Sequence, residues 1–112
     1  MERSNISFKV RQGYLVVPKE KIMFCKAEGS YSTVYIIGGK SVLVSKSLAI
    51  IEDCLGQDFF VRCHNSYLVN ISKVELFDSK NKRVTIMGHL IPVSRRKVNS
   101  LIHRLNSFNY HL

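Results

Sequence analysis

The stretch FVRCHNSYLVN, residues Phe60–Asn70, places two short apolar runs around a polar centre. Both ends have strand character, because aromatic, β-branched and aliphatic residues are concentrated there. The middle, RCHNS at 62–66, is crowded with side chains that can donate hydrogen bonds. A strand that only fills a core does not need such groups. The stretch therefore predicts two strands that bracket a polar segment available for binding.

The rest of the chain repeats this arrangement of short β runs separated by turn residues. Dipeptides such as Gly29-Ser30 and Gly38-Gly39 stand between apolar stretches, where glycine permits a tight turn. This spacing predicts a mostly β fold of short antiparallel strands, built as a sandwich or open barrel. The expected strands are 6–11, 14–17, 22–28, 31–37, 40–45, 59–63, 67–69, 74–77, 83–87 and 90–93.

Two segments instead show the 3.6-residue period of a helix, at about 46–55 and 95–105. The first places its apolar residues on one face and is followed by Gly56, a residue that commonly ends helices. The second repeats apolar residues at i, i+3, i+4 and i+7 from Val98, and Ser94 is a suitable N-cap. No linker or internal repeat is visible, so 112 residues predict one domain.

The chain is strongly basic, with a formal net charge of +9 and a pI of about 9.8. Such an excess favours a polyanionic partner, nucleic acid first and an acidic membrane surface second. The alternative is a soluble protein whose basic charge has no role in binding. The charge is also uneven, which predicts a basic face. From residue 79 to the end there is no Asp or Glu, whereas the same stretch carries Lys80, Lys82, Arg83, Arg95, Arg96, Lys97 and Arg104.

Cysteine usage and the N-terminal sequence indicate a cytoplasmic protein without a cofactor. Cys25, Cys54 and Cys63 show neither zinc-ligand nor disulfide-framework spacing, which predicts reduced thiols and no metal site. The N-terminus lacks the apolar segment of a signal peptide, and no apolar run approaches the ~20 residues of a membrane span. Cys63 and His64 are adjacent and would point to opposite faces of a strand, which does not suit a Cys–His nucleophile pair. We therefore expect no enzyme.

The second predicted helix begins with Arg95, Arg96 and Lys97, where the helix dipole favours acids. Each exposed cation there costs about 0.3–1 kcal/mol. A bound phosphate would relieve this repulsion and accept hydrogen bonds from free N–H groups. The pattern favours phosphate contact over three side chains that simply extend into water.

Three motifs together resemble one family. FFVRCHNSYLVN (59–70) resembles the FxRxHxSxxVN signature of the LytTR (LytR/AgrA-type) DNA-binding domain of bacterial transcription regulators. KIMFCKAEGSYSTVYIIGGKSVLVSKSL (21–48) and IPVSRRKVNSLIHRL (91–105) are similar to the flanking parts of that domain, in the same order. The resemblance covers about residues 6–105 and implies an elongated LytTR-type fold. It also implies one such domain over 1–112, with no receiver domain in these residues.

The resemblance further implies that three loops enter successive major grooves of duplex DNA. In the family these loops read bases, and the matching positions here are Asn65, Arg96 and Ser32. Asn suits adenine and Arg suits guanine, each through two hydrogen bonds. Residues expected to contact phosphate or to position the loops are Tyr31, Lys46, Arg62, His64, Ser66, Ser94, Arg95 and Lys97.

Several of these residues have alternative roles. Asn65 can bond its own turn, and Arg62 can pair with Asp58. Tyr31 can serve as a cross-strand packing residue rather than a DNA contact. Ser66 can cap a short helical turn.

Two further residues of the motif have roles that the resemblance leaves open. A cysteine in the loop of Cys63 is linked to redox sensing in close relatives, whereas a small, partly buried thiol is the simpler interpretation. Asn70 closes the motif and is expected to serve the fold by bonding backbone.

Two other kinds of binding compete with a duplex reader. A small β-barrel for RNA or single strands would depend on stacked aromatics such as Tyr31 and Tyr67. An interaction module without DNA binding would not depend on Arg96. For a duplex reader, the family implies two copies on direct repeats and a receiver or sensor domain outside these residues.

Overall fold

The computed structural model describes residues 4–110 and 112. The strands are β1 (Asn5–Val10), β2 (Gly13–Pro18), β3 (Ile22–Glu28), β4 (Tyr31–Ile36), β5 (Lys40–Val44), β6 (Phe60–His64), β7 (Tyr67–Asn70), β8 (Leu76–Asp78), β9 (Arg83–Ile86) and β10 (His89–Pro92). The α-helices are α1 (Leu48–Leu55) and α2 (Val98–Phe108), and the 3-10 helices are η1 (Lys19–Lys21), η2 (Ile71–Lys73) and η3 (Arg95–Lys97). Each predicted strand overlaps an observed one, and the mostly β fold is confirmed.

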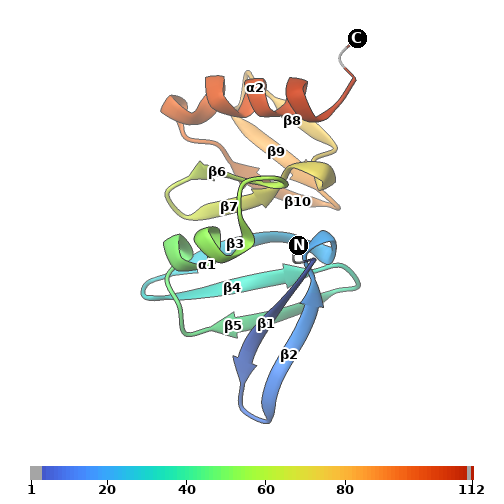
Figure 1. The fold of residues 1–112 in the computed structure, drawn as a ribbon. Coiled ribbons are helices and arrows are strands. Elements are labelled where there is room, and N and C mark those ends of the chain that lie inside the picture. Colours follow the sequence, from blue (N-terminus) through green and yellow to red (C-terminus); the bar gives the residue numbers. More distant parts are fainter. Residues whose placement is uncertain (1–3, 111) are drawn as a thin grey trace.

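The strands form three antiparallel sheets in the described part of the chain. A five-stranded sheet of order β5-β4-β3-β7-β6 lies in the middle, the β1–β2 hairpin lies on one side of it, and the sheet β10-β9-β8 lies on the other. The body is elongated, measuring 45 × 33 × 24 Å, with α2 at one end and the β1–β2 hairpin at the other (Figure 1). The three sheets do not close into a barrel.

Both faces of the central sheet are buried at its inner strands β4, β3 and β7, because these strands alternate between two apolar cores. Leu68 of β7 points into a core shared with the β1–β2 hairpin and α1, whereas its neighbour Val69 points into a core shared with β9, β10 and α2. Val34 and Tyr35 of β4 divide in the same way. Fully burying one such aliphatic side chain contributes roughly 1.5–3 kcal/mol. The two cores therefore hold the outer layers onto the sheet.

Two β-bulges modify this alternation. The pairing of β3 with β4 shifts between Ile22 and Phe24, and both Met23 and Phe24 then face the second core. The pairing of β6 with β7 shifts between Arg62 and His64, next to the polar turn of the motif. Bulges commonly redirect side chains close to functional sites.

The first helix matches its prediction closely. α1 begins at Leu48, after Ser47, whose Oγ accepts a hydrogen bond from the Ile50 N–H at 3.4 Å. It ends at Leu55, and the following Gly56 adopts a positive φ of 79°, which glycine tolerates best. Neither α-helix in the described residues is long and apolar enough to cross a membrane.

The start of the second helix was predicted wrongly. Residues 95–97 form η3, and α2 begins only at Val98. Ser94 makes no N-cap hydrogen bond, because its Oγ donates instead to the Cys63 carbonyl at 3.5 Å. The Val98 N–H is already satisfied by the carbonyl of Arg95. The three cations thus lie just before the α-helix, where fewer N–H groups are free than the sequence suggested.

Asn70 links the central sheet to η2 from a fully buried position. Its Nδ2 donates to the Ile22 carbonyl at 2.8 Å, and its Oδ1 accepts from the N–H and the hydroxyl of Ser72. The predicted structural role of Asn70 agrees with this geometry.

We expect Asn70→Ala to lower the free energy of unfolding by about 2–4 kcal/mol, because it leaves the buried Ile22 carbonyl and the Ser72 N–H without their partner. Urea unfolding followed by circular dichroism measures the change. Asn99→Ala, at an exposed position of α2, is the matched control and should change stability by less than about 0.5 kcal/mol. Equal effects from the two variants would contradict the role given to Asn70.

Candidate nucleic-acid interface

One edge of the molecule gathers all three predicted contact segments. The β3–β4 turn, the β6–β7 turn and the start of α2 lie along the left side of Figure 1. The Ala27 N–H donates to the Ser66 carbonyl at 2.8 Å, and the Ser94 N–H donates to the Cys63 carbonyl at 2.9 Å. These bonds tie neighbouring segments together. We call residues 28–32, 46, 62–66 and 94–97 the contact edge.

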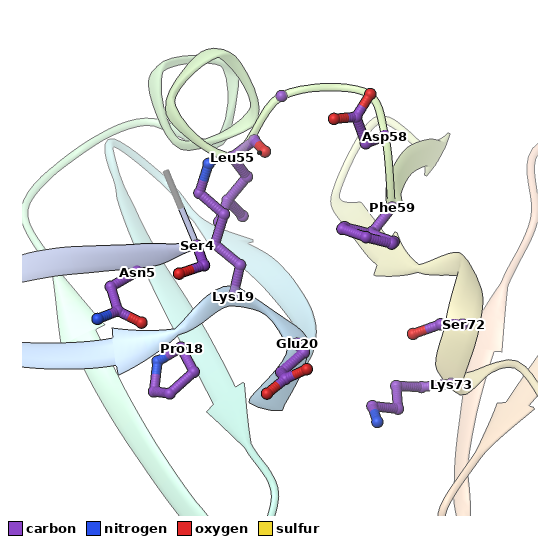
Figure 2. A pocket seen from close by; sticks show the side chains of 11 residues that line it. Ser4, Asn5, Pro18, Lys19, Glu20, Leu55, Asp58, Phe59, Ser72 and Lys73 are labelled. Atoms are coloured by element: carbon purple, nitrogen blue, oxygen red, sulfur yellow. Dashed lines mark hydrogen bonds between the residues drawn. The ribbon is translucent and has the colours of Figure 1, made fainter. Parts of the chain in front are cut away.

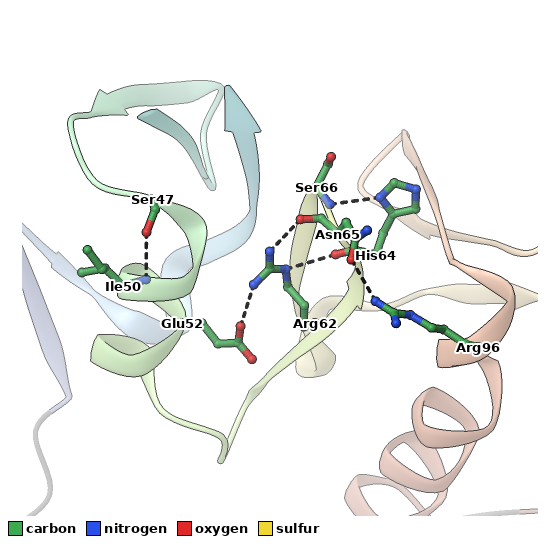
Figure 3. Close-up of polar contacts among 8 residues, drawn as sticks. All are labelled: Ser47, Ile50, Glu52, Arg62, His64, Asn65, Ser66 and Arg96. Carbon is green, nitrogen blue, oxygen red and sulfur yellow. Dashed lines mark hydrogen bonds and ion pairs between the residues drawn. The ribbon is translucent and has the colours of Figure 1, made fainter. Parts of the chain in front are cut away.

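Arg62 holds the middle turn of the contact edge in place. Its guanidinium pairs with the Glu52 carboxylate of α1 at 2.8 Å, and the same group donates to the carbonyls of His64 at 3.1 Å and Asn65 at 2.6 Å. Figure 3 shows Glu52 reaching this guanidinium from one side of the turn. These bonds use three of the five N–H donors of Arg62, whose side chain is only 24% exposed, so the geometry favours positioning of the turn over contact with phosphate. Its partner is also Glu52, not Asp58.

His64 and Ser66 shape the same turn. The Ser66 N–H donates to Nδ1 of His64 at 3.0 Å, which leaves Nε2 to carry the proton of a neutral ring. The imidazole also stands edge-on to the ring of Tyr67, with centroids 5.7 Å apart. Ser66 caps no helical turn here, and its side chain is half-buried. Both residues therefore position the turn, whatever else they contact.

Asn65 and Arg96, the two residues expected to read bases, meet directly. Arg96 Nη2 donates to Asn65 Oδ1 at 3.2 Å, across 31 positions of sequence, and both side chains are exposed (Figure 3). The side chain of Asn65 thus bonds Arg96 and not its own turn. A carbonyl oxygen can accept a second hydrogen bond, and Asn65 Nδ2 is still available as a donor.

The first contact segment, at the β3–β4 turn, does not expose the residue that was expected to read a base. Ser32 is fully buried, and its Oγ donates to the Lys46 carbonyl at 2.9 Å. This burial does not favour base contact by Ser32, and its hydroxyl instead joins β4 to the segment just before α1. Tyr31 is 47% exposed and Lys46 is exposed, so these two residues present the surface of this segment.

The third segment supplies cations without acidic partners. Arg95 and Arg96 are exposed, and Lys97 is partly exposed. Among the residues that the structure describes, none of the three forms an ion pair. Their charges are therefore available to an anion from outside, as the sequence indicated.

Cys63 lies behind the contact edge as a fully buried thiol. Its Sγ donates to the Pro92 carbonyl at 3.6 Å. Burial raises the pKa of the Cys63 thiol to about 12, outweighing the smaller lowering by a backbone hydrogen bond and by the charge of Arg62. A thiol with so little thiolate is a poor nucleophile, which favours the structural interpretation.

A cleft of about 710 Å³ lies away from this edge (Figure 2). It is lined by Lys19, Leu55 and Phe59 among others, and Phe59 precedes the end of β6 opposite to the polar turn. Lysines and carboxylates both contribute to it, including Lys73 and Asp58. The cleft has no basic excess and is not part of the contact edge.

Comparison with known proteins defines the class. The family model of the LytTr DNA-binding domain matches residues 12–106. The chain belongs to the LytTR family of DNA-binding domains, which is a regulatory class and not a class of enzymes. A solved LytTr DNA-binding domain of a Bacillus cereus response regulator has the same fold, with a TM-score of 0.78 and 25% identity, over 93% of this chain and 98% of that one.

Two longer relatives are regulatory proteins by name. The positive alginate biosynthesis regulatory protein of Pseudomonas aeruginosa is 32% identical over 92% of this chain. The CO-responsive transcriptional regulator RcoM of Rhodospirillum rubrum is 31% identical over 71% of it. The matches span only 44% and 36% of those two proteins.

Glu52 is the residue of this site that sequence reasoning missed. It lies on the helix α1 and approaches Arg62 only in the folded chain. The one available signal was an acid on the polar side of a short amphipathic helix. That signal is too common to identify a positioning residue.

We expect Glu52→Gln to weaken binding to a cognate duplex by roughly three- to tenfold, or about 0.7–1.4 kcal/mol, because Arg62 loses its anchor. Simple electrostatics predicts the opposite sign, since the variant is more positive. Fluorescence anisotropy decides between them. Asp53→Gln, an exposed neighbour in α1 with the same loss of charge, is the control. Tighter binding by both variants would exclude the positioning role.

Thiol labelling tests the burial of Cys63 and Cys25, whose pKa values are each raised to about 12 by desolvation. At pH 8 such a thiol is only about one part in ten thousand thiolate. We expect iodoacetamide to label exposed Cys54 alone in the folded protein, and all three cysteines in urea. Labelling of folded Cys63 as fast as Cys54, measured by peptide mass spectrometry, would contradict the structure.

Proposed function

We propose that this domain binds double-stranded DNA sequence-specifically, as the output domain of a bacterial transcription regulator in the cytoplasm. The turns of the contact edge enter successive major grooves. The observation that carries the proposal is the meeting of Asn65 and Arg96 at an exposed edge, with Arg95 and Lys97 beside them. Asn65 suits adenine N6 and N7, and Arg96 suits guanine O6 and N7.

The Asn65–Arg96 contact supports readout in a specific way. Each side chain limits the rotamers of the other before DNA arrives, and this lowers the entropy lost on binding. The two side chains also come from different segments, so they address neighbouring bases together. A bidentate contact of this kind contributes roughly 1–3 kcal/mol of discrimination against a wrong base.

The remaining residues of the edge contact phosphate or hold the loops. Arg95, Lys97 and Lys46 attract the backbone without reading sequence. Arg62 acts through Glu52 and the turn, and Ser32 acts through the Lys46 carbonyl. Contacts to sugar or phosphate are further assigned to Tyr31, His64, Ser66 and Ser94.

The partners extend beyond this chain. Because the relatives are more than twice as long as the matched part, we propose that a receiver or sensor domain controls this one. Two copies would bind direct repeats about one helical turn apart, which places both on one side of the duplex.

Selection from a random double-stranded DNA pool, with a single-stranded RNA pool in parallel, tests the proposal first. We expect a short motif to be enriched from the duplex pool, repeated about 10 base pairs apart. Enrichment from the RNA pool alone would replace the proposal with single-strand binding. Enrichment from neither pool would leave the charge of +9 as a source of non-specific attraction.

Variants of the edge should separate reading from attraction. Arg96→Ala should flatten discrimination at one or two base positions, whereas Lys97→Ala should weaken all duplexes alike. If about 4–6 phosphates are neutralised, the logarithm of the binding constant should fall against log salt with a slope of about −4 to −5. Anisotropy with the selected duplex and a scrambled one measures both quantities. Equal loss of discrimination in the two variants would refute the assigned roles.

A further inference from the structure

The β8–β9 turn carries a group of cations that were not among the residues predicted to contact DNA. Lys80, Lys82 and Arg83 fall within four positions, and Lys80 and Arg83 are exposed. Asp78 is the last acid of the chain, so no carboxylate follows it in sequence. A cluster of this size on one turn is a strong local source of positive potential.

The fold places this turn directly beside the third contact segment. The Val93 N–H donates to the Lys82 carbonyl at 2.8 Å, and Arg83 is the cross-strand partner of Pro92. Pro92 and Val93 immediately precede Ser94 and the cations of η3. The β8–β9 turn therefore lies next to the third contact segment in the folded chain.

The turn is also held in one conformation. The Asp78 carboxylate accepts from the Lys80 N–H at 3.1 Å, from the Asn81 N–H at 3.0 Å and from Asn81 Nδ2 at 2.7 Å. Lys82 follows in the left-handed region, with φ 53°. A lysine is an uncommon residue at such a backbone angle, where Asn or Gly is easier to accommodate. A lysine at this position is explained if its ammonium group binds an anion.

We infer that the β8–β9 turn is a further phosphate-binding segment. Lys80 and Lys82 contact the DNA backbone beyond the base pairs that Arg96 reads, and Arg83 adds to the attraction. The inference rests on the proposed duplex binding and extends it, since it lengthens the footprint on one flank only. Phosphate contacts of this kind add affinity and register without reading sequence.

The double variant Lys80→Gln/Lys82→Asn tests the inference, with Asn chosen because it tolerates a positive φ. The matched control is Lys21→Gln/Lys40→Gln. Both control lysines are exposed, and they lie beside the Ile22–Ile36 pair at the far ends of β3 and β4. Each double variant lowers the formal charge of +9 by two. The measurements are salt-dependent anisotropy and hydroxyl-radical footprinting on the selected duplex.

We expect the turn variant to flatten the salt slope by about 1.8, the value for two phosphates, and to lose protection on one flank of the site. Its ratio of affinities for selected and scrambled duplexes should stay unchanged. The control should keep both its slope and its footprint. Equal behaviour of the two double variants would overturn the inference while the proposed function stands. No duplex binding by the wild-type protein would overturn both.

Discussion

Burial of both faces of the inner strands of the central sheet constrains everything else in this domain. Residues in the middle of β3, β4 and β7 must alternate between two apolar cores, so hydrogen-bonding side chains there would lose their solvation without gaining partners. The polar residues of the motif are therefore confined to the strand ends. Because the sheet is antiparallel, the β3–β4 and β6–β7 turns fall at the same edge. The interface is thus a consequence of how the cores are filled.

Two arginines of this edge show why charge alone does not define a binding residue. Arg62 is partly buried and uses three of its five N–H donors to bond one carboxylate and two backbone carbonyls. Arg96 is exposed and bonds a single side-chain oxygen. The first keeps a turn in shape, and the second offers most of its donors to a ligand. Both count equally toward the net charge, but only the second can exchange its contacts for DNA at low cost.

The strands were predictable because their alternation is local, and the mostly β fold followed from them. The prediction for Ser32 failed although a signal was present. Ser32 shares its parity along β4 with the buried residues Val34 and Ile36, so alternation places it inside. The predicted first residue of the second helix was wrong for another reason. Residues 95–97 have helical propensity, but a 3-10 turn forms there, with the Ser94 hydroxyl bonded to the Cys63 carbonyl.

The sequence by itself determined the alternation, the turn positions, the basic C-terminal third and the motif that carries the resemblance. These are properties of neighbouring residues, and secondary structure depends on them directly. Only the tertiary structure decided that Glu52 anchors Arg62, that Asn65 meets Arg96 and that Lys82 lies beside Val93. Hydrogen bonds form only within a few tenths of an ångström and over a narrow range of angles. The packing of distant strand ends sets those distances, and no periodicity in the chain records them.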